Sequence, residues 1–187
     1  TRAGLRPMHA ARPSRLALCG LAAAALATCL GLAGCGIAPR DAAPDTPRVI
    51  VLRHAEKATD DPRDPSLSAV GAERAARVAA RLDGAPLTAV YATGYRRTRD
   101  TAAPAAAAHG LPVHAYDPDE IAAFAAALRA ADIDGVVLII GHSNTVPATV
   151  AALCDCEVAP MRDDEFDRWT EVHLPPGQPP RVVTTRY

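Results

Sequence analysis

Short apolar runs alternate with longer stretches of helical periodicity from residue 48 onward. The apolar, β-branched runs predict four strands, at residues 48–53, 87–93, 111–117 and 135–140. Apolar residues at helical spacing predict four helices between and after them, at residues 69–82, 95–109, 118–130 and 144–153. Strands that alternate with helices of this length predict right-handed crossovers and a largely parallel sheet.

Local signals refine several of these elements. Ser68 is a suitable N-cap for the first helix, and Asp83 with Gly84 predicts its end. Pro104 lies inside the second predicted helix, where it indicates a kink or a late first turn, and Pro118 is expected in the first turn of the third.

The end of the chain has a different pattern, with two β-like runs, 165–174 and 181–187, on either side of the turn-forming residues 175–180. The sequence therefore predicts an α/β fold: a three-layer αβα sandwich with a mostly parallel central sheet and a C-terminal antiparallel strand pair. This domain spans residues 48–187 and is long enough to bury one core.

The first 34 residues have the layout of a secretory signal, with four arginines, no acid and then an Ala-rich apolar run. A retained anchor helix is the alternative, although glycines and a threonine interrupt the run. Residues 32–35 resemble the lipobox of bacterial lipoproteins, which implies cleavage before Cys35 and its lipidation. Residues 35–47, rich in proline, are then a lipid-anchored flexible tether.

We therefore expect an exported protein, lipid-anchored on the periplasmic side of the bacterial cell envelope. Gly36, rather than Asp, after the lipidated cysteine slightly favours the outer membrane by analogy. Cys154 and Cys156 remain in the exported part. Their close spacing leaves open whether they form a strained disulfide or stay reduced.

The net charge of the exported part argues against one class of function. The whole chain has 20 basic and 21 acidic residues, and removal of residues 1–34, with 4 basic and none acidic, leaves 16 and 21, a net charge of −5. Such a balance argues against nucleic-acid binding. The domain also has no Cys/His cluster with zinc spacing, so neither a metal nor another cofactor is expected.

Two of the predicted strands lead into a histidine. Residues 49–52 run into Arg53 and His54, and residues 136–140 run through Gly141 into His142. Ligands bind at the carboxyl ends of parallel strands, so these side chains should converge if the two strands are neighbours. Arginine and imidazole suit a phosphoryl group, and a neutral imidazole is a nucleophile that needs no separate base.

The chain resembles the histidine phosphatase superfamily, whose fold is phosphoglycerate mutase-like. The resemblance lies in four motifs in order, LRHAEK (52–57), DPSLSAVGAERA (64–75), YATGYRRTRDTAAP (91–104) and IIGHSN (139–144). It implies that His54 is the nucleophile that forms phosphohistidine, and that Arg53, Arg97 and His142 grip the phosphoryl oxygens. Arg96 and Arg99 are expected to be solvated or to support the site from outside.

The family also supplies a proton to the leaving oxygen from a carboxyl group, for which Asp117 is our first candidate and Asp119 and Glu120 are its rivals. Glu56 and Lys57 follow the nucleophile and are candidates for substrate binding or for a surface ion pair. His109, His114, His173, Phe166 and Trp169 are expected to be structural.

These observations predict a metal-independent phosphatase that acts on a small phosphorylated substrate, and its only other partner is the membrane, through Cys35. The resemblance implies a phosphatase rather than a mutase, because the mutase branch of the family carries longer insertions around its pocket than this domain has room for. A non-catalytic phosphate-binding envelope lipoprotein of the same fold is the alternative, and a structural lipoprotein with a decayed site is disfavoured because all four phosphate-gripping positions are present.

Overall fold

A computed structural model describes residues 47–187, so the predicted signal peptide, Cys35 and almost all of the tether lie outside the described residues. The elements in chain order are β1 (Arg48–Arg53), α1 (Ala69–Arg81), β2 (Leu87–Ala92), α2 (Arg96–Ala108), β3 (Val113–Ala115), α3 (Ile121–Ala130), β4 (Val136–Gly141), α4 (Thr145–Cys154), β5 (Arg168–His173) and β6 (Arg181–Arg186). The predicted α/β alternation and the C-terminal strand pair are confirmed.

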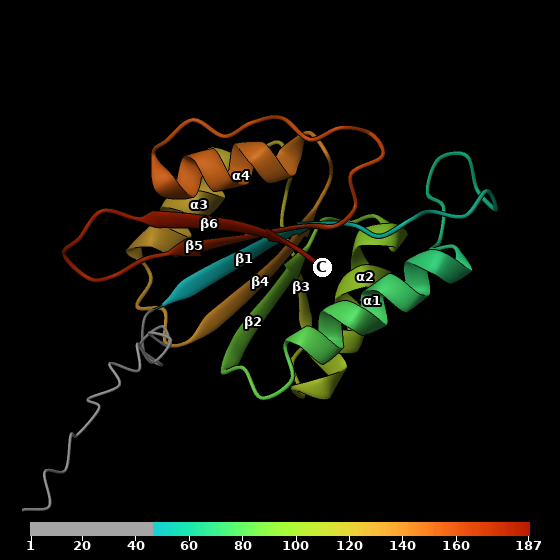
Figure 1. Cartoon of the computed structure of the whole chain (residues 1–187), viewed down its shortest axis with the longest axis horizontal. Helices are drawn as coiled ribbons and strands as arrows, with labels where there is room; N and C mark the ends of the chain where they lie inside the picture. Colours follow the sequence, from blue (N-terminus) through green and yellow to red (C-terminus); the bar gives the residue numbers. More distant parts are fainter. Residues whose placement is uncertain (1–46) are drawn as a thin grey trace, which may run out of the picture. The chain divides into compact units, whose positions relative to one another are not determined.

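The six strands form one sheet in the order β3-β2-β4-β1-β5-β6. Strands β1 to β4 pair in parallel, whereas β5 runs antiparallel to β1 and to β6. Figure 1 shows α1 and α2 on one side of this sheet and α3 and α4 on the other. This is the predicted three-layer arrangement, and it makes β1 and β4 neighbours at the centre.

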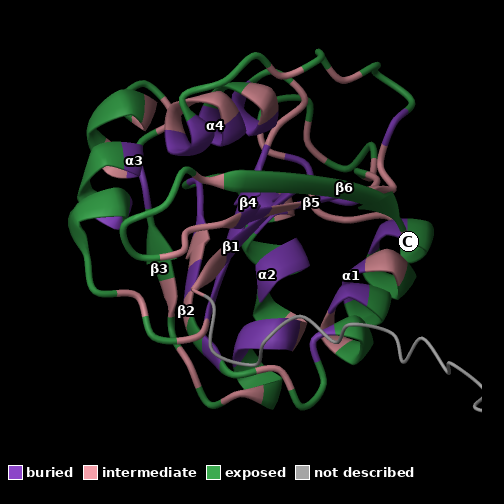
Figure 2. Cartoon of the chain, turned by 60° about the vertical axis from the view of Figure 1, so that its left-hand side comes forward, coloured by how far each residue is buried: buried purple, intermediate pink, exposed green. Residues whose placement is uncertain are grey.

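The alternation of side chains along the central strands builds two cores. In β1, Ile50 and Leu52 pack into the core under α1 and α2, whereas Val49 and Val51 pack into the core under α3 and α4. Both faces of β1 and β4 are buried, while β6 is exposed along its length (Figure 2). This burial explains why β1 and β4 read as continuous apolar runs rather than as alternating ones.

The structure tests the predicted starts of α1 and α3. Ser68 caps α1 by accepting a hydrogen bond from the Gly71 N–H, as expected. Pro118, however, lies before α3 and not in its first turn, because the Asp117 carboxylate accepts the Asp119 N–H and closes a turn there.

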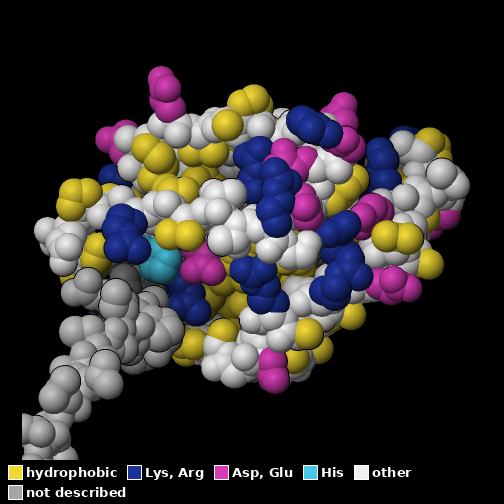
Figure 3. Space-filling view, viewed as in Figure 1, with side chains coloured by type: hydrophobic (Ala, Val, Ile, Leu, Met, Phe, Trp, Pro, Cys, Tyr) yellow, Lys and Arg dark blue, Asp and Glu magenta, His cyan; other side chains and the backbone are white. Residues whose placement is uncertain are grey.

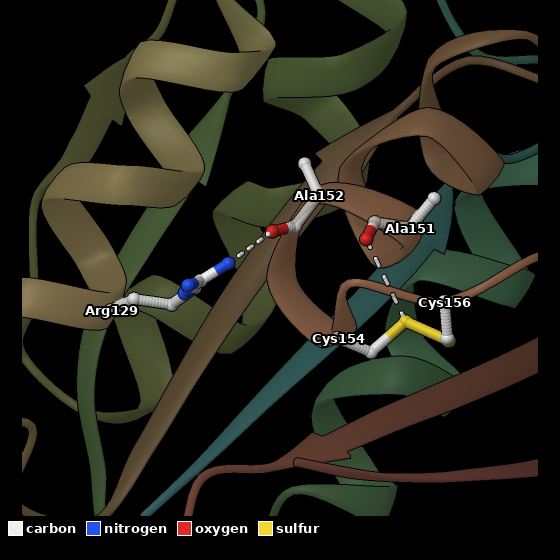
Figure 4. The surroundings of a disulfide bond; sticks show 5 residues. All are labelled: Arg129, Ala151, Ala152, Cys154 and Cys156. Carbon is white, nitrogen blue, oxygen red and sulfur yellow. Dashed lines mark hydrogen bonds between the residues drawn. A yellow bond between two sulfur atoms is a disulfide. The ribbon is translucent and has the colours of Figure 1, made fainter. Parts of the chain in front are cut away.

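The segment after α4 begins with a disulfide between Cys154 and Cys156 (Figure 4). Asp155, between them, ends α4 in the left-handed conformation with φ of 53°. Of the two states that the sequence leaves open, the structure has the disulfide. Within residues 47–187, none of the helices has the length and apolarity needed to span a bilayer.

Candidate active site

The register of β1 and β4 brings the two histidines together. Arg53 pairs with Gly141, so the next residue of each strand, His54 and His142, leaves the same edge of the sheet. The His54 N–H continues the ladder by donating to the Gly141 carbonyl at 2.9 Å. The imidazole rings lie edge to face with their centroids 5.3 Å apart. The predicted convergence of the two histidines is therefore present.

The ring of His54 is buried and held by the backbone. Its Nδ1 lies 2.7 Å from the Ala55 carbonyl oxygen. A carbonyl can only accept a hydrogen bond, so Nδ1 must carry the proton and Nε2 must present its lone pair. Burial, reinforced by the neighbouring His142 and arginines, lowers the pKa of His54 to about 4. His54 is therefore a neutral imidazole with a free nucleophilic nitrogen at pH 7.

The ring of His142 is held by side chains instead. Its Nε2 lies 2.9 Å from the Thr93 hydroxyl, and its Nδ1 lies 3.5 Å from Nη2 of Arg97. Burial and then the charge of Arg97 lower the pKa of His142 to about 4 as well. Both imidazoles are thus neutral in the free site, and the positive charge there belongs to the arginines.

Arg97 lies in the first turn of α2, whose free N–H groups also favour an anion. Its guanidinium covers the ring of Tyr95 at 4.3 Å, and its Nη1 lies 3.9 Å from the Asp64 carboxylate. Arg96 points elsewhere and forms an exposed ion pair with Asp60 at 3.5 Å. The structure therefore places Arg97, and not Arg96, beside His142.

Arg53 contacts the segment that follows the disulfide. Its Nη1 lies 2.9–3.1 Å from the carbonyl oxygens of Arg162, Asp163 and Glu165. Its guanidinium also lies 4.0 Å above the ring of Phe166, which the sequence predicts only as a packing residue. The Nε of Arg53 is buried and has no hydrogen-bond acceptor within residues 47–187.

Glu56, a predicted substrate-binding residue, has a different partner in the structure. Both of its carboxylate oxygens accept hydrogen bonds from Arg74 of α1, at 2.6–3.1 Å. Its carbonyl accepts the Ser68 N–H, and a Cβ on Gly71 would lie only 2.1 Å from that oxygen. The motif around Ser68 and Gly71 thus fixes the backbone after His54. Lys57 is exposed and makes an isolated bridge with Leu67.

Asp117, the first candidate for the proton donor, is not brought to the histidines by any contact within residues 47–187. It follows β3, which is separated from β1 by β2 and β4. Its exposed carboxylate accepts the Asp119 N–H, and Glu120 lines a separate hollow with Phe124. The carboxylate with a described contact to Arg97 is that of Asp64.

Four threonines support the site and were missed by the sequence analysis. Thr93 and Thr98 contact each other at 2.9 Å beneath His142. Thr101 accepts the Ala55 N–H and donates to the Arg97 carbonyl, while Thr145 accepts the His142 N–H. Three of them are fully buried, and Thr145 is nearly so. The sequence signal that could have identified these threonines is their position, at the end of a predicted strand or near the start of a predicted helix.

Charge on the rest of the surface is mixed: acidic and basic side chains interleave over the face seen in Figure 3. Within residues 47–187, no cluster of three or more His, Cys, Asp or Glu side chains could hold a metal ion. The two neutral imidazoles together with Arg53 and Arg97 form a group that suits chemistry on an anion.

Comparison with known proteins agrees with this geometry. Residues 49–118 match the histidine phosphatase superfamily (branch 1), a range that includes Arg53, His54 and Arg97. His142 lies outside the match, so its place is given by the fold. No curated protein matches the chain significantly in sequence.

Solved structures share the fold. The protein histidine phosphatase SixA, complexed with tungstate, has a TM-score of 0.62 at 22% identity, over 74% of this chain and 96% of its own. Mycobacterial glucosyl-3-phosphoglycerate phosphatase with VO3 has a TM-score of 0.58 at 17% identity, over 75% and 98%. A phosphoserine phosphatase variant from Entamoeba histolytica with phosphoserine has a TM-score of 0.57 at 13% identity, over 73% and 95%. Residues 49–118 are therefore similar to the histidine phosphatase superfamily, and the solved structures share the fold of the described part of the chain.

Proposed function

We propose that the chain hydrolyses small phosphomonoesters through a phosphohistidine on His54, without a metal ion. The observation that carries this proposal is the fixed tautomer of His54, whose Nδ1 lies 2.7 Å from the Ala55 carbonyl and whose Nε2 is thereby left as a nucleophile. The family match and the phosphatase neighbours support it at the level of phosphatase activity.

The reaction has two halves. Nε2 of His54 attacks phosphorus while the bond to the leaving oxygen breaks, and Arg97, Arg53 and the ring of His142 stabilise the phosphoryl oxygens. Water then attacks the phosphohistidine, releases phosphate and restores the neutral imidazole. The hydrogen bond from Nδ1 to the Ala55 carbonyl keeps Nε2 of His54 as the nitrogen that faces phosphorus in both halves of the reaction.

The first test is hydrolysis of p-nitrophenyl phosphate in the presence of a chelator, with His54→Ala as its partner. We expect turnover in the unaltered chain, none in the variant, and acid-labile phosphate on the quenched unaltered protein. Turnover that survives in His54→Ala, or acid-stable phosphate on the protein, would rule out the phosphohistidine route.

A second candidate is a phosphate-binding protein without turnover. It is favoured by the position of Asp117, whose carboxylate is used in a turn and has no described contact with the site. Phosphate binding by a chain that hydrolyses no member of a broad phosphoester panel would support this candidate.

We also propose that the domain is exported and anchored through Cys35. The Cys154–Cys156 disulfide supports an oxidising compartment. Metabolic labelling with a radioactive fatty acid should mark the chain and should fail with Cys35→Ser, whereas equal labelling of both would contradict the anchor.

A further inference from the structure

The hydroxyls beneath His142 have a single consistent pattern of hydrogen bonds. Oγ1 of Thr98 lies 2.8 Å from the Tyr95 carbonyl and 3.0 Å from the Thr93 carbonyl. Carbonyls only accept, so the one hydroxyl hydrogen of Thr98 is directed to them. In the 2.9 Å contact between the two hydroxyls, Thr93 is then the donor and Thr98 the acceptor.

This order fixes the proton on His142. The Thr93 hydroxyl has given its hydrogen to Thr98, so it accepts from the ring, and Nε2 of His142 must carry the proton. Arg97 gives an independent indication, because its Nη2 can only donate toward Nδ1, at a rather long 3.5 Å. Both observations leave the lone pair of Nδ1 on the side of Arg97, where the phosphoryl group is expected.

We propose that Thr93 and Thr98 form a positioning relay which makes His142 a proton acceptor, so that the site binds a tetrahedral oxyanion together with one proton. This rests on the proposed function for the identity of the ligand. A neutral His142 ring with its proton on Nδ1 could donate a hydrogen bond to the ligand directly. The ring held by Thr93 and Thr98 has its proton on Nε2, so Nδ1 first has to gain a proton before it can donate.

The proton balance is simple. A phosphomonoester monoanion brings a proton on one oxygen, this proton moves to Nδ1 of His142, and the resulting imidazolium donates it back as a charge-assisted hydrogen bond. An oxyanion without a proton, such as sulfate, requires one from solvent. The proton on Nδ1 is then held at the phosphoryl group, near the leaving oxygen that requires one, and Asp117 is not needed for this step.

The surroundings of the ring are consistent with this cycle. The charged and titratable groups that face His142 are Arg53 at the end of β1, His54 directly after it, Tyr95 at the N-cap of α2 and Arg97 in its first turn. Burial and these positive charges lower the pKa of His142 in the free protein, and a bound anion acts in the opposite direction. Proton uptake is therefore coupled to binding.

Ring-nitrogen NMR on the purified chain tests the relay directly, with His142→Ala and His54→Ala to assign the signals. In the free protein we expect His142 to carry its proton on Nε2 only, and saturation with sulfate near neutral pH should protonate both of its nitrogens. A free ring with its proton on Nδ1, or protonation of His54 alone when sulfate binds, would overturn the proposal.

Calorimetry with sulfate in buffers of different ionisation enthalpy gives a second measurement. The unaltered chain should take up about one proton per sulfate near neutral pH, so affinity should fall about tenfold per pH unit as pH rises. Thr98→Val removes the acceptor of the Thr93 hydroxyl, which can then donate to Nε2 and move the ring proton to Nδ1. The uptake should therefore approach zero, and Thr98→Ser should restore it.

Thr149→Val is the matched control, because the hydroxyl of Thr149 is also buried but bonds to the Thr145 carbonyl within α4. Its proton uptake should equal that of the unaltered chain, and an equal loss in both valine variants would contradict the relay. Sulfate binding requires no turnover, so this test can fail while phosphatase activity is present, and it can succeed in a chain without activity.

Discussion

The two histidines of the site end neighbouring strands, yet they are held in different ways. His54 is oriented by the backbone carbonyl of Ala55, whereas His142 is oriented by the hydroxyl of Thr93 and, through it, by Thr98. A backbone carbonyl cannot be removed by substitution, but a hydroxyl can. The tautomer of His54, the proposed nucleophile, is thus fixed by the fold itself, while the tautomer of the second imidazole depends on side chains that selection can change.

Replacement of either histidine should have the largest effect and should separate their roles. His54→Ala removes the nucleophile, so activity toward p-nitrophenyl phosphate should fall by more than about 10⁴-fold. His142→Ala removes the proton acceptor that stabilises the phosphoryl group but leaves His54 in place, and a loss of about 10²- to 10³-fold is expected. Acid-labile phosphate should still form slowly in His142→Ala. Equal losses in the two variants would remove the distinction between nucleophile and stabiliser.

Replacing the two arginines beside the histidines should affect the stability of the protein differently. Arg97→Ala should lower kcat/KM by about 10²- to 10³-fold with little change in melting temperature, because its described partners are partly exposed. Arg53→Ala should lower activity and also the free energy of unfolding by about 2 kcal/mol, because three carbonyls lose their donor. Thermal melts beside kinetics measure both. A large fall in melting temperature for Arg97→Ala would make that residue structural.

The acid limb of the pH profile should report the burial of His54. Its pKa is lowered from 6.5 to about 4, so the nucleophile stays neutral as pH falls through 6 and is protonated only near 4. The fall in kcat/KM on the acid side should therefore be centred near pH 4. At pH 5 the activity should be about 30-fold higher than an exposed imidazole with a pKa of 6.5 would allow. An acid limb centred near 6.5 would contradict this environment for His54.

The same shifts predict how stability depends on pH. In the unfolded chain both imidazoles gain a proton as pH falls below about 6.5, whereas in the folded chain they resist it until about 4. Their contribution to the free energy of unfolding is thus fully present above 6.5 and is lost as pH falls toward 4. Denaturant titrations of the unaltered chain and of His54→Ala should converge over this interval.

The smallest effect on chemistry is expected from Glu56→Gln. The carboxylate of Glu56 pairs with Arg74, and this contact lowers the pKa of Glu56, so the substitution should reduce stability by about 1 kcal/mol. KM for p-nitrophenyl phosphate should not change. A several-fold rise in KM with an unchanged melting temperature would instead support the substrate-binding role that the sequence suggested.

Much of the fold could be predicted because the signals were local. The continuous apolar runs of β1 and β4 indicated strands covered on both faces, and Ser68 marked the start of α1 correctly. The start of α3 was misplaced because the side chain of Asp117 forms a turn where Pro118 would also have suited a helix. Where a helix starts depends on which polar side chain accepts a hydrogen bond from the backbone N–H groups there. The periodicity of apolar residues carries no information about that.

The site was predictable to the extent that it lies at strand ends. Arg53, His54 and His142 were found because parallel neighbours present their carboxyl ends at one edge. Arg97 was found because it lies in one of the four motifs that resemble those of the histidine phosphatase superfamily. Glu56 was proposed for the substrate because it follows the nucleophile in sequence. In the structure its side chain turns to Arg74 on α1, a residue that periodicity alone did not connect with it.

The sequence by itself determined which chemistry is available: two imidazoles and a pair of arginines, carried by strands and a helix whose order follows from hydrophobic periodicity. Only the tertiary structure decided the state of those groups. Desolvation at the edge of the sheet keeps both imidazoles neutral, and hydrogen bonds to the Ala55 carbonyl and the Thr93 hydroxyl determine which nitrogen of each ring is free. The physical reason is that desolvation and hydrogen-bond direction depend on neighbours in space, which a residue's own type and position in the chain do not specify.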